Sequence, residues 1–167
     1  MGKYNLDLHD DSIDEITLNK FGDKIFVSGD DANLWERFGD GYKKFIELAE
    51  KSENKLAELE KKYPANDGEP DSDHTLEELK IRTELCESTL HIIDDIFGEG
   101  TAKKSFREQY EAIPGFLPDE DKLTAFFDVM TPIMEDIFKR KAERSREASK
   151  KRMRKYQPQD HKRKGEK

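Results

Sequence analysis

The chain has 167 residues, of which 34% are hydrophobic and 41% are charged. This length fits one domain with a modest core, and so polar a composition predicts mostly amphipathic helices with wide solvated faces. No apolar run approaches the roughly 20 residues that span a membrane, and the N-terminus lacks the apolar core of a signal peptide. The single cysteine, Cys86, excludes an intramolecular disulfide framework and a cysteine-based zinc site, so we expect a protein of the reducing cytoplasm.

The net charge of −8 conceals two oppositely charged regions. Residues 139–167 contain 14 Lys and Arg against 4 Asp and Glu, a balance of +10. Residues 1–138 therefore contain 16 Lys and Arg against 34 Asp and Glu, a balance of −18. This asymmetry indicates that the basic region folds back on the acidic body, pairs with a neighbouring subunit, or contacts an outside polyanion.

Residues 1–12 are polar, and we expect them to be flexible. Residues 13–28 predict a β-hairpin with a turn at residues 21–23. The apolar residues that alternate along its two strands are Ile16, Leu18, Ile25 and Val27. Because two strands alone are marginal in water, one face of this hairpin should pack on a helix or on another chain.

A long helix is predicted over residues 32–62, with Asp30 or Asp31 as its cap. Its apolar residues follow the spacing of a heptad seam, and they are Trp35, Phe38, Tyr42, Phe45, Ala49, Leu56 and Leu59. Gly39 and Gly41 weaken the helix and allow a bend. The four aromatic residues of the seam are the richest candidate surface for a partner, and the equal alternative is that all four only fill the core.

Residues 63–74 contain prolines, a glycine and several acids, which end this helix. A second helix is predicted over residues 76–97, because Thr75 and Glu78 have the spacing of a capping box and Gly98 suits a left-handed cap. Its apolar stripe comprises Leu79, Cys86, Leu90, Ile93 and Phe97, broadened by Leu85, Ile92 and Ile96.

A short helix is predicted over residues 102–111, and the last helix runs from Pro118 or Asp119 to about Tyr156. The buried stripe of the last helix comprises Leu123, Phe127, Met130, Met134 and Ile137. Beyond Phe138 it has almost no apolar face, and we expect disorder after Pro158.

The predicted fold is mainly α. An N-terminal β-hairpin and a small bundle of three to four helices occupy residues 13–138, and a long basic C-terminal helix with a disordered tail occupies residues 139–167.

The stretch IIDDIFGEGTAKKSF, residues 92–106, has the glycines, lysines and serine of a phosphate-binding loop without its spacing. No glycine stands directly before Lys104 and Ser105, and a helix rather than a strand leads into the stretch. We interpret it as a helix end at Gly98, a tight turn, and a new helix capped by Thr101. The adjacent carboxylates Asp94 and Asp95 provide either surface charge or a hydrogen bond to this turn.

No other group of residues has the spacing of a reactive site. The acidic loop with Asp67, Glu69, Asp71 and Asp73 lacks the glycine and the closing glutamate of a calcium loop. The four histidines are isolated from one another, and Cys86 is interpreted as a packing residue. We therefore predict no catalytic, cofactor-binding or metal-binding residues and do not expect an enzyme.

The basic stretch KRKAERSREASKKRMRKY, residues 139–156, is a second candidate surface for a partner. The basic residues that we single out in it are Lys150, Lys151, Arg152 and Arg154. This charge suits contacts with nucleic-acid phosphates, but only Tyr156 offers a ring for stacking and the acidic body repels a polyanion. An acidic surface of a protein partner or of a sister subunit is the better prediction.

Three segments resemble the tail assembly chaperones of siphophages and prophages from Gram-positive hosts. They are the hairpin ITLNKFGDKIFVS with its aromatic-rich helix, the stretch IIDDIFGEGTAKKSF, and the final-helix segment LTAFFDVMTPIMEDIFKRKAER. The second is the most specific, because it is close to the Ile-Asp-x-Ile/Leu-Phe-Gly-Glu-Gly-Thr/Ala stretch of that family. The likeness covers most of residues 13–145 and departs from the family at Arg107, where glycine is usual.

The resemblance implies a non-enzymatic protein of the host cytoplasm that needs no cofactor. Such a protein coats the tape measure protein, keeps it soluble, helps the tail tube protein polymerise around it, and self-associates. Two alternatives stay open: a helical structural or adaptor protein of a phage, and a nucleic-acid-associated regulator that acts through its basic tail.

Overall fold

A computed structural model describes residues 1–6, 12–63 and 72–156. In chain order these residues form β1 (Ile13–Thr17), β2 (Lys24–Ser28), α1 (Ala32–Lys62), α2 (Ser72–Phe97), α3 (Thr101–Ser105), α4 (Arg107–Ala112) and α5 (Glu120–Tyr156). The predicted mainly α fold, with an N-terminal hairpin and a long C-terminal helix, is confirmed. Three predictions concern residues outside this description. They are the flexibility of residues 7–11, most of the acidic loop, and the disorder after Pro158.

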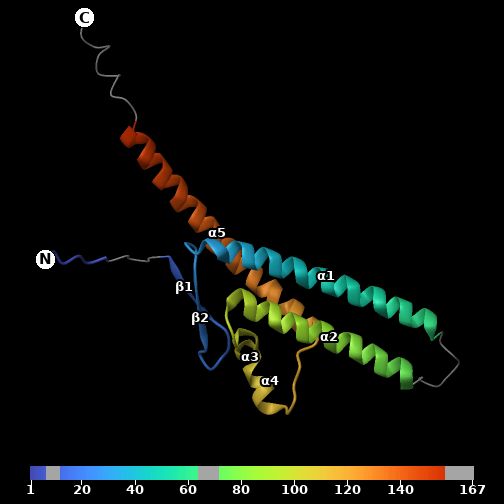
Figure 1. Cartoon of the computed structure of the whole chain (residues 1–167). Coiled ribbons are helices and arrows are strands. Elements are labelled where there is room, and N and C mark those ends of the chain that lie inside the picture. The colour runs from blue at the N-terminus through green and yellow to red at the C-terminus, as the bar shows by residue number, and fades with distance from the viewer. Residues whose placement is uncertain (7–11, 64–71, 157–167) are drawn as a thin grey trace, which may run out of the picture.

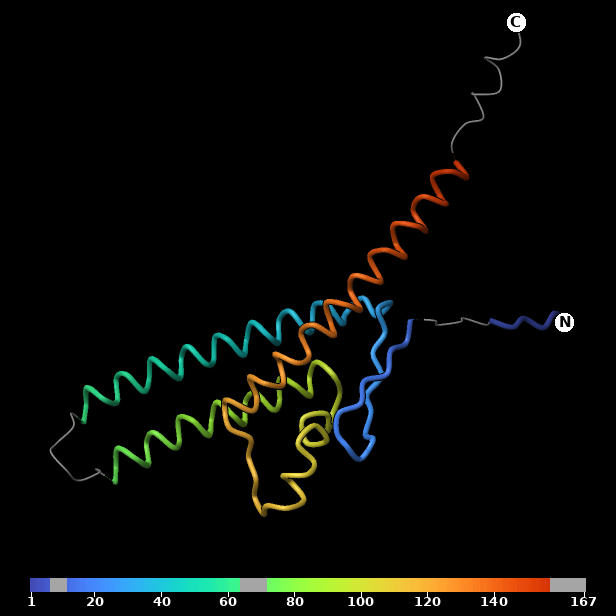
Figure 2. Tube along the Cα trace, turned by 180° about the vertical axis from the view of Figure 1, so that it is seen from behind, coloured from blue at the N-terminus to red at the C-terminus, as the bar shows by residue number. Residues whose placement is uncertain are grey.

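The helices form a small bundle with the hairpin at one end. α1 and α2 lie side by side, α5 crosses them, and the hairpin stands next to α3 and α4 (Figure 1 and Figure 2). The last part of α5 leaves this bundle and extends away from it in both views.

The hairpin packs one face on helices, as predicted. β1 and β2 are antiparallel, with Ile16 opposite Ile25. Ile16, Ile25 and Val27 are buried in one cluster with Leu34 of α1 and three residues of α5, which are Met130, Met134 and Ile137. The hairpin is therefore stabilised by helix packing rather than by its own ladder.

α1 begins and ends at the predicted residues, and the side chain of Asp31 accepts a hydrogen bond from the Asn33 amide at 3.0 Å. The core contains Phe45 and Leu59 of the predicted seam, and also Leu34, which the heptad spacing omits. The helix is continuous through both of its glycines. Gly41 is buried, and a Cβ there would lie 2.5 Å from Cδ1 of Ile96, so this glycine permits the close approach of α2.

α2 begins at Ser72, one turn before the predicted start, so the proposed capping box at Thr75 is wrong because Thr75 lies inside the helix. Asp73 in the first turn suits the positive end of the helix dipole and favours the earlier start. In the second half of α2, Cys86 and Ile93 of the predicted stripe are buried and Leu90 and Phe97 are half-buried, whereas Leu79 in the first half is 54% exposed. The first half of α2 lies beside α1 alone, whereas the second half lies against both α1 and the rest of the bundle (Figure 1).

The predicted helix over residues 102–111 is instead two short helices, α3 and α4, separated at Phe106. Gly98 and Gly100 adopt positive φ angles of 110° and 85° in the turn before them. Thr101 is the first residue of α3 and not its cap. The carboxylate of Asp94 accepts hydrogen bonds from the amides of Gly100 and Ala102, at 3.2 and 2.9 Å, so Asp94 takes the capping role.

α5 buries every residue of its predicted stripe and continues to Tyr156. Its first turn is capped by Asp119, which accepts a hydrogen bond from the Lys122 amide at 2.9 Å. The N-terminal part of the stripe, Leu123 and Phe127, joins a cluster with α1, α2 and α3. The remaining part joins the hairpin cluster, so α5 connects the two halves of the core.

Candidate partner-binding surfaces

The four aromatic residues of α1 lie against α5 and α2. Phe45 is buried and stacks on Phe127 with 4.8 Å between ring centroids. Phe38 is half-buried between the two core clusters, and half-buried Trp35 meets Phe138 edge-on at 5.0 Å. Tyr42 is 36% exposed, with its ring 5.6 Å from that of Phe127. Their contacts are those of packing residues, and Tyr42 presents the largest exposed fraction of the four.

An apolar groove of about 320 Å³ runs between the hairpin and α5, and we call it the hairpin–α5 groove. The apolar residues that shape it include Leu18, Phe106, Ala125, Phe126, Val129 and Ile133. Val129 is 66% exposed at this groove. Lys122 and Gln109 supply polar groups at its margin. An exposed apolar groove with a few polar groups is typical of a site for a partner's apolar side chains.

A second groove of about 560 Å³ lies between the hairpin and the end of α2, and we call it the hairpin–α2 groove. Phe26, which is 64% exposed, and the exposed Ile13 line it together with Phe97. Its margin is polar, because Arg37 lies there, pairs with Asp31 at 2.9 Å and donates to the carbonyl of Ile96. This polar ion pair makes the second groove less suited to a purely apolar ligand than the first.

Neither groove is predicted by the sequence pattern, because the pattern identifies stripes and not the surfaces between elements. Val129 gives the available signal: it is a β-branched apolar residue that falls outside the buried stripe of α5. Phe26 gives the same signal on the hairpin, because its neighbours Ile25 and Val27 point to the core.

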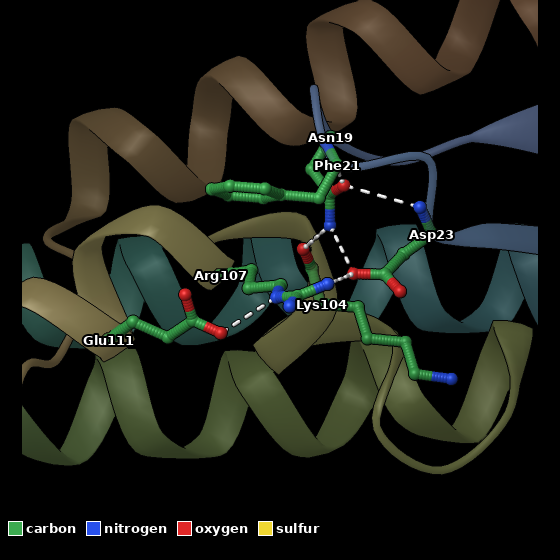
Figure 3. A network of polar contacts seen from close by, with 6 residues as sticks. All are labelled: Asn19, Phe21, Asp23, Lys104, Arg107 and Glu111. Atoms are coloured by element: carbon green, nitrogen blue, oxygen red, sulfur yellow. Dashed lines mark hydrogen bonds and ion pairs between the residues drawn. The ribbon is translucent and has the colours of Figure 1, made fainter.

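Arg107 holds the hairpin turn on the two short helices (Figure 3). Its guanidinium pairs with Asp23 at 3.0 Å and with Glu111 at 2.8 Å, and lies over the ring of Phe21 at 4.7 Å. The side chain of Asn19 accepts hydrogen bonds from the amides of Phe21 and Asp23 and donates to the carbonyl of Lys104. These contacts fix the hairpin wall of the hairpin–α5 groove relative to the wall that α3 and α4 form.

The pKa of Asp23 is lowered, first by the hydrogen bond from Asn19 and then by that from Arg107. A lowered pKa in the folded state means that the carboxylate stabilises the fold above the ordinary aspartate pKa of about 3.9. This contribution is lost as the pH falls through the lowered folded pKa.

We therefore expect the Asp23→Asn variant to be less stable than the wild type at neutral pH and equally stable at the acid end. The measurement is the free energy of unfolding in urea for both proteins, from about pH 7 down to about pH 2. A difference that stays constant over this whole range would contradict the role of the Asp23 charge.

The basic residues singled out from the sequence lie far from both grooves. Lys150, Lys151, Arg152 and Arg154 are all exposed on the part of α5 that leaves the bundle (Figure 1). The structure does not bring them near the aromatic residues of α1, so the two predicted surfaces are separate.

The described residues offer little for covalent or metal chemistry. Burial raises the pKa of the Cys86 thiol to about 11, and the carboxylates of Asp119 and Glu120 contribute, so the thiolate is scarce at neutral pH. In the part of the chain that the structure describes, no three His, Cys, Asp or Glu side chains converge as metal ligands. Within the same residues, no helix combines the length and apolar character needed to cross a bilayer.

Comparison with known proteins gives one family. No curated protein and no solved structure matches the chain. Residues 24–167 match DUF6673, which is described as a family of unknown function. This match begins at β2 and includes all the described helices, α1 to α5. These helices include the ones that line the two grooves. The chain therefore belongs to the DUF6673 family of unknown function.

Proposed function

We propose that the protein is a tail assembly chaperone that binds helical segments of the tape measure protein in the hairpin–α5 groove. By covering the apolar side chains of this client, it keeps the client soluble in the host cytoplasm and makes it available to the tail tube protein. Binding and release need no catalysis and no cofactor. The proposal joins the sequence resemblance to the shape and chemistry of the groove.

The observation that carries the proposal is the exposed apolar wall that α5 presents to the groove. The wall runs from Lys122 to Ile133, which is roughly 17 Å of helix. Ala125 and Val129 on it are exposed, whereas Phe126 and Met130 anchor it in the core. A long apolar groove beside a helix suits an amphipathic helix that inserts side chains at spacings of three and four residues.

The opposite wall supports the same proposal. Leu18 follows β1, and Phe106 lies between α3 and α4, so three separate elements of the chain converge on one apolar surface. The contacts of Arg107 with the hairpin turn hold these elements together. A preorganised groove binds a client at a lower entropic cost than a flexible surface does.

The test uses the full chain with Val129→Glu, co-expressed with an amphipathic helical fragment of the tape measure protein from the same genome. A carboxylate at this position would be desolvated by an apolar client, so we expect the fragment to lose solubility and co-purification. Because Val129 is exposed, its replacement should leave the fold intact, which thermal unfolding checks.

Thr124→Glu is the matched control, because Thr124 is exposed on α5 and does not line the groove. This variant should retain the fragment as the wild type does. Retention by both variants, or failure of the wild type to hold any fragment, would contradict the proposed function.

A further inference from the structure

α5 is divided into two oppositely charged halves. Residues 120–138 contain five Asp and Glu against one Lys, a balance of −4. Residues 139–156 contain ten Lys and Arg against two Glu, a balance of +8. One continuous helix therefore carries a negative half inside the bundle and a positive half that leaves it.

The first basic residues of this positive half already bind acidic residues of the body. Arg140 pairs with Asp14 at 2.9 Å, and Lys141 pairs with Asp30. The hydrogen bond from Lys141 is the first cause of the lowered pKa of Asp30, and Arg144 adds to the effect. Beyond Arg144, no ion pair joins the positive half to the described body, and the end of α5 extends away from the bundle (Figure 2).

We call residues 145–156 the basic arm. All of its residues are exposed, and its six Lys and Arg side chains form no ion pair with the described residues. An isolated helical segment of this length without an apolar face is marginal in water. A partner that supplies negative charge would stabilise it.

A complementary surface exists on the first half of α5. Asp121, Asp128 and Glu135 recur every seven residues, all three are exposed, and none forms an ion pair within the described part of the chain. We call these three residues the acidic face. Seven residues are about two helical turns, so the three carboxylates follow one side of the helix.

The arm cannot reach the acidic face of its own chain. Asp121 and Lys150 are separated by 29 residues of continuous helix, which is roughly 44 Å. A second copy can supply the face if two α5 helices lie antiparallel. Each arm then contacts the acidic face of the other copy, which is a closed two-fold arrangement.

We propose that two copies of the chain associate through α5, with the basic arm of each bound to the acidic face of the other. The proposal does not depend on the identity of the client. A nucleic acid is the less suitable partner, because residues 1–138 carry a balance of −18 and repel a polyanion.

The experiment is sedimentation velocity of the full chain at about 0.1 M and about 1 M salt, where the Debye length falls from about 10 Å to about 3 Å. We expect a dimer at the lower salt that dissociates at the higher salt. The variant with Lys150, Lys151, Arg152 and Arg154 replaced by Glu should be monomeric at both.

Two further proteins make this test specific. The control variant replaces Lys43, Lys44, Lys51 and Lys55 of α1 by Glu, which changes the net charge by the same amount and should leave the dimer intact. The face variant replaces Asp121, Asp128 and Glu135 by Lys and should be monomeric. Mixing the arm variant with the face variant restores opposite charges across both contacts, with their signs reversed at one of them, so this mixture should form a heterodimer.

A wild-type monomer at the lower salt would overturn the proposal, and so would a mixture of the two variants that stays monomeric. Equal loss of the dimer in the arm variant and in the α1 control would also overturn it, because net charge would then be the cause. If the wild type is monomeric and its arm shifts the mobility of a nucleic acid, the arm binds polyanions instead.

Discussion

Replacing Phe127 by alanine is expected to lower the free energy of unfolding by about 3–5 kcal/mol. Phe127 is 1% exposed and contacts three other rings, with centroid distances of 4.8 Å to Phe45, 5.6 Å to Tyr42 and 5.5 Å to Phe126. The truncation removes these contacts and leaves a cavity where α1 and α5 meet. Since small domains have a total stability of about 5–15 kcal/mol, urea unfolding should show a large shift.

Phe26→Ala is the control for this prediction, because Phe26 is the same residue type on the solvent face of the hairpin. Its loss should change the free energy of unfolding by less than about 1 kcal/mol. Equal losses at the two positions would contradict the assignment of Phe127 to the centre of the core.

Replacing Gly41 by leucine is expected to destabilise the protein by at least about 2 kcal/mol, although leucine favours helices. A Cβ at this position would lie 2.5 Å from Cδ1 and 2.8 Å from Cγ1 of Ile96, and 3.2 Å from Cγ2 of Ile92. Ile96 is itself buried, so α1 and α2 would have to separate. The measurement is the midpoint of urea unfolding, with the slope as a check that the transition is unchanged.

Gly39→Leu provides the matched comparison two residues earlier in the same helix. Gly39 is exposed, and a Cβ at this position would have no neighbouring element of the described structure within 4 Å. Removing a helix-interior glycine there should stabilise the protein by up to about 1 kcal/mol. Destabilisation of equal size at both positions would show that the close approach of α2 is not the cause.

The sequence predicts the helices and the core of α5 well, because apolar spacing directly reflects which side of a helix is buried. Phe127 and Met134 belong to a stripe that the structure buries without exception. The sequence predicts the hairpin equally well, because the buried Ile25 and Val27 alternate with the exposed Phe26. These features depend on residues close together in the chain.

Other features depend on tertiary contacts and could not be read in this way. Gly41 looks like a weak point in α1, whereas the structure uses its missing side chain to bring Ile96 close. Thr75 has the spacing of a cap, but α2 begins one turn earlier, at Ser72. Phe106 interrupts a segment whose residue types favour one helix.

The candidate surfaces show the same division. The basic residues of α5 are evident from composition alone, and the structure places them on a helix beyond the bundle. The hairpin–α5 groove is different, because Leu18, Phe106 and Val129 come from three distant parts of the chain. Only their arrangement in space shows that an apolar surface is left uncovered.

The most direct measurement of client binding in the hairpin–α5 groove is photo-cross-linking of a helical tape measure fragment. A photoreactive phenylalanine analogue is placed at position 129 in one protein and at position 124 in another, about 140° apart around α5. The proposed function predicts cross-links to the fragment from position 129 and none above background from position 124. Equal labelling from both positions, or labelling only from a probe at position 26 in the hairpin–α2 groove, would contradict it.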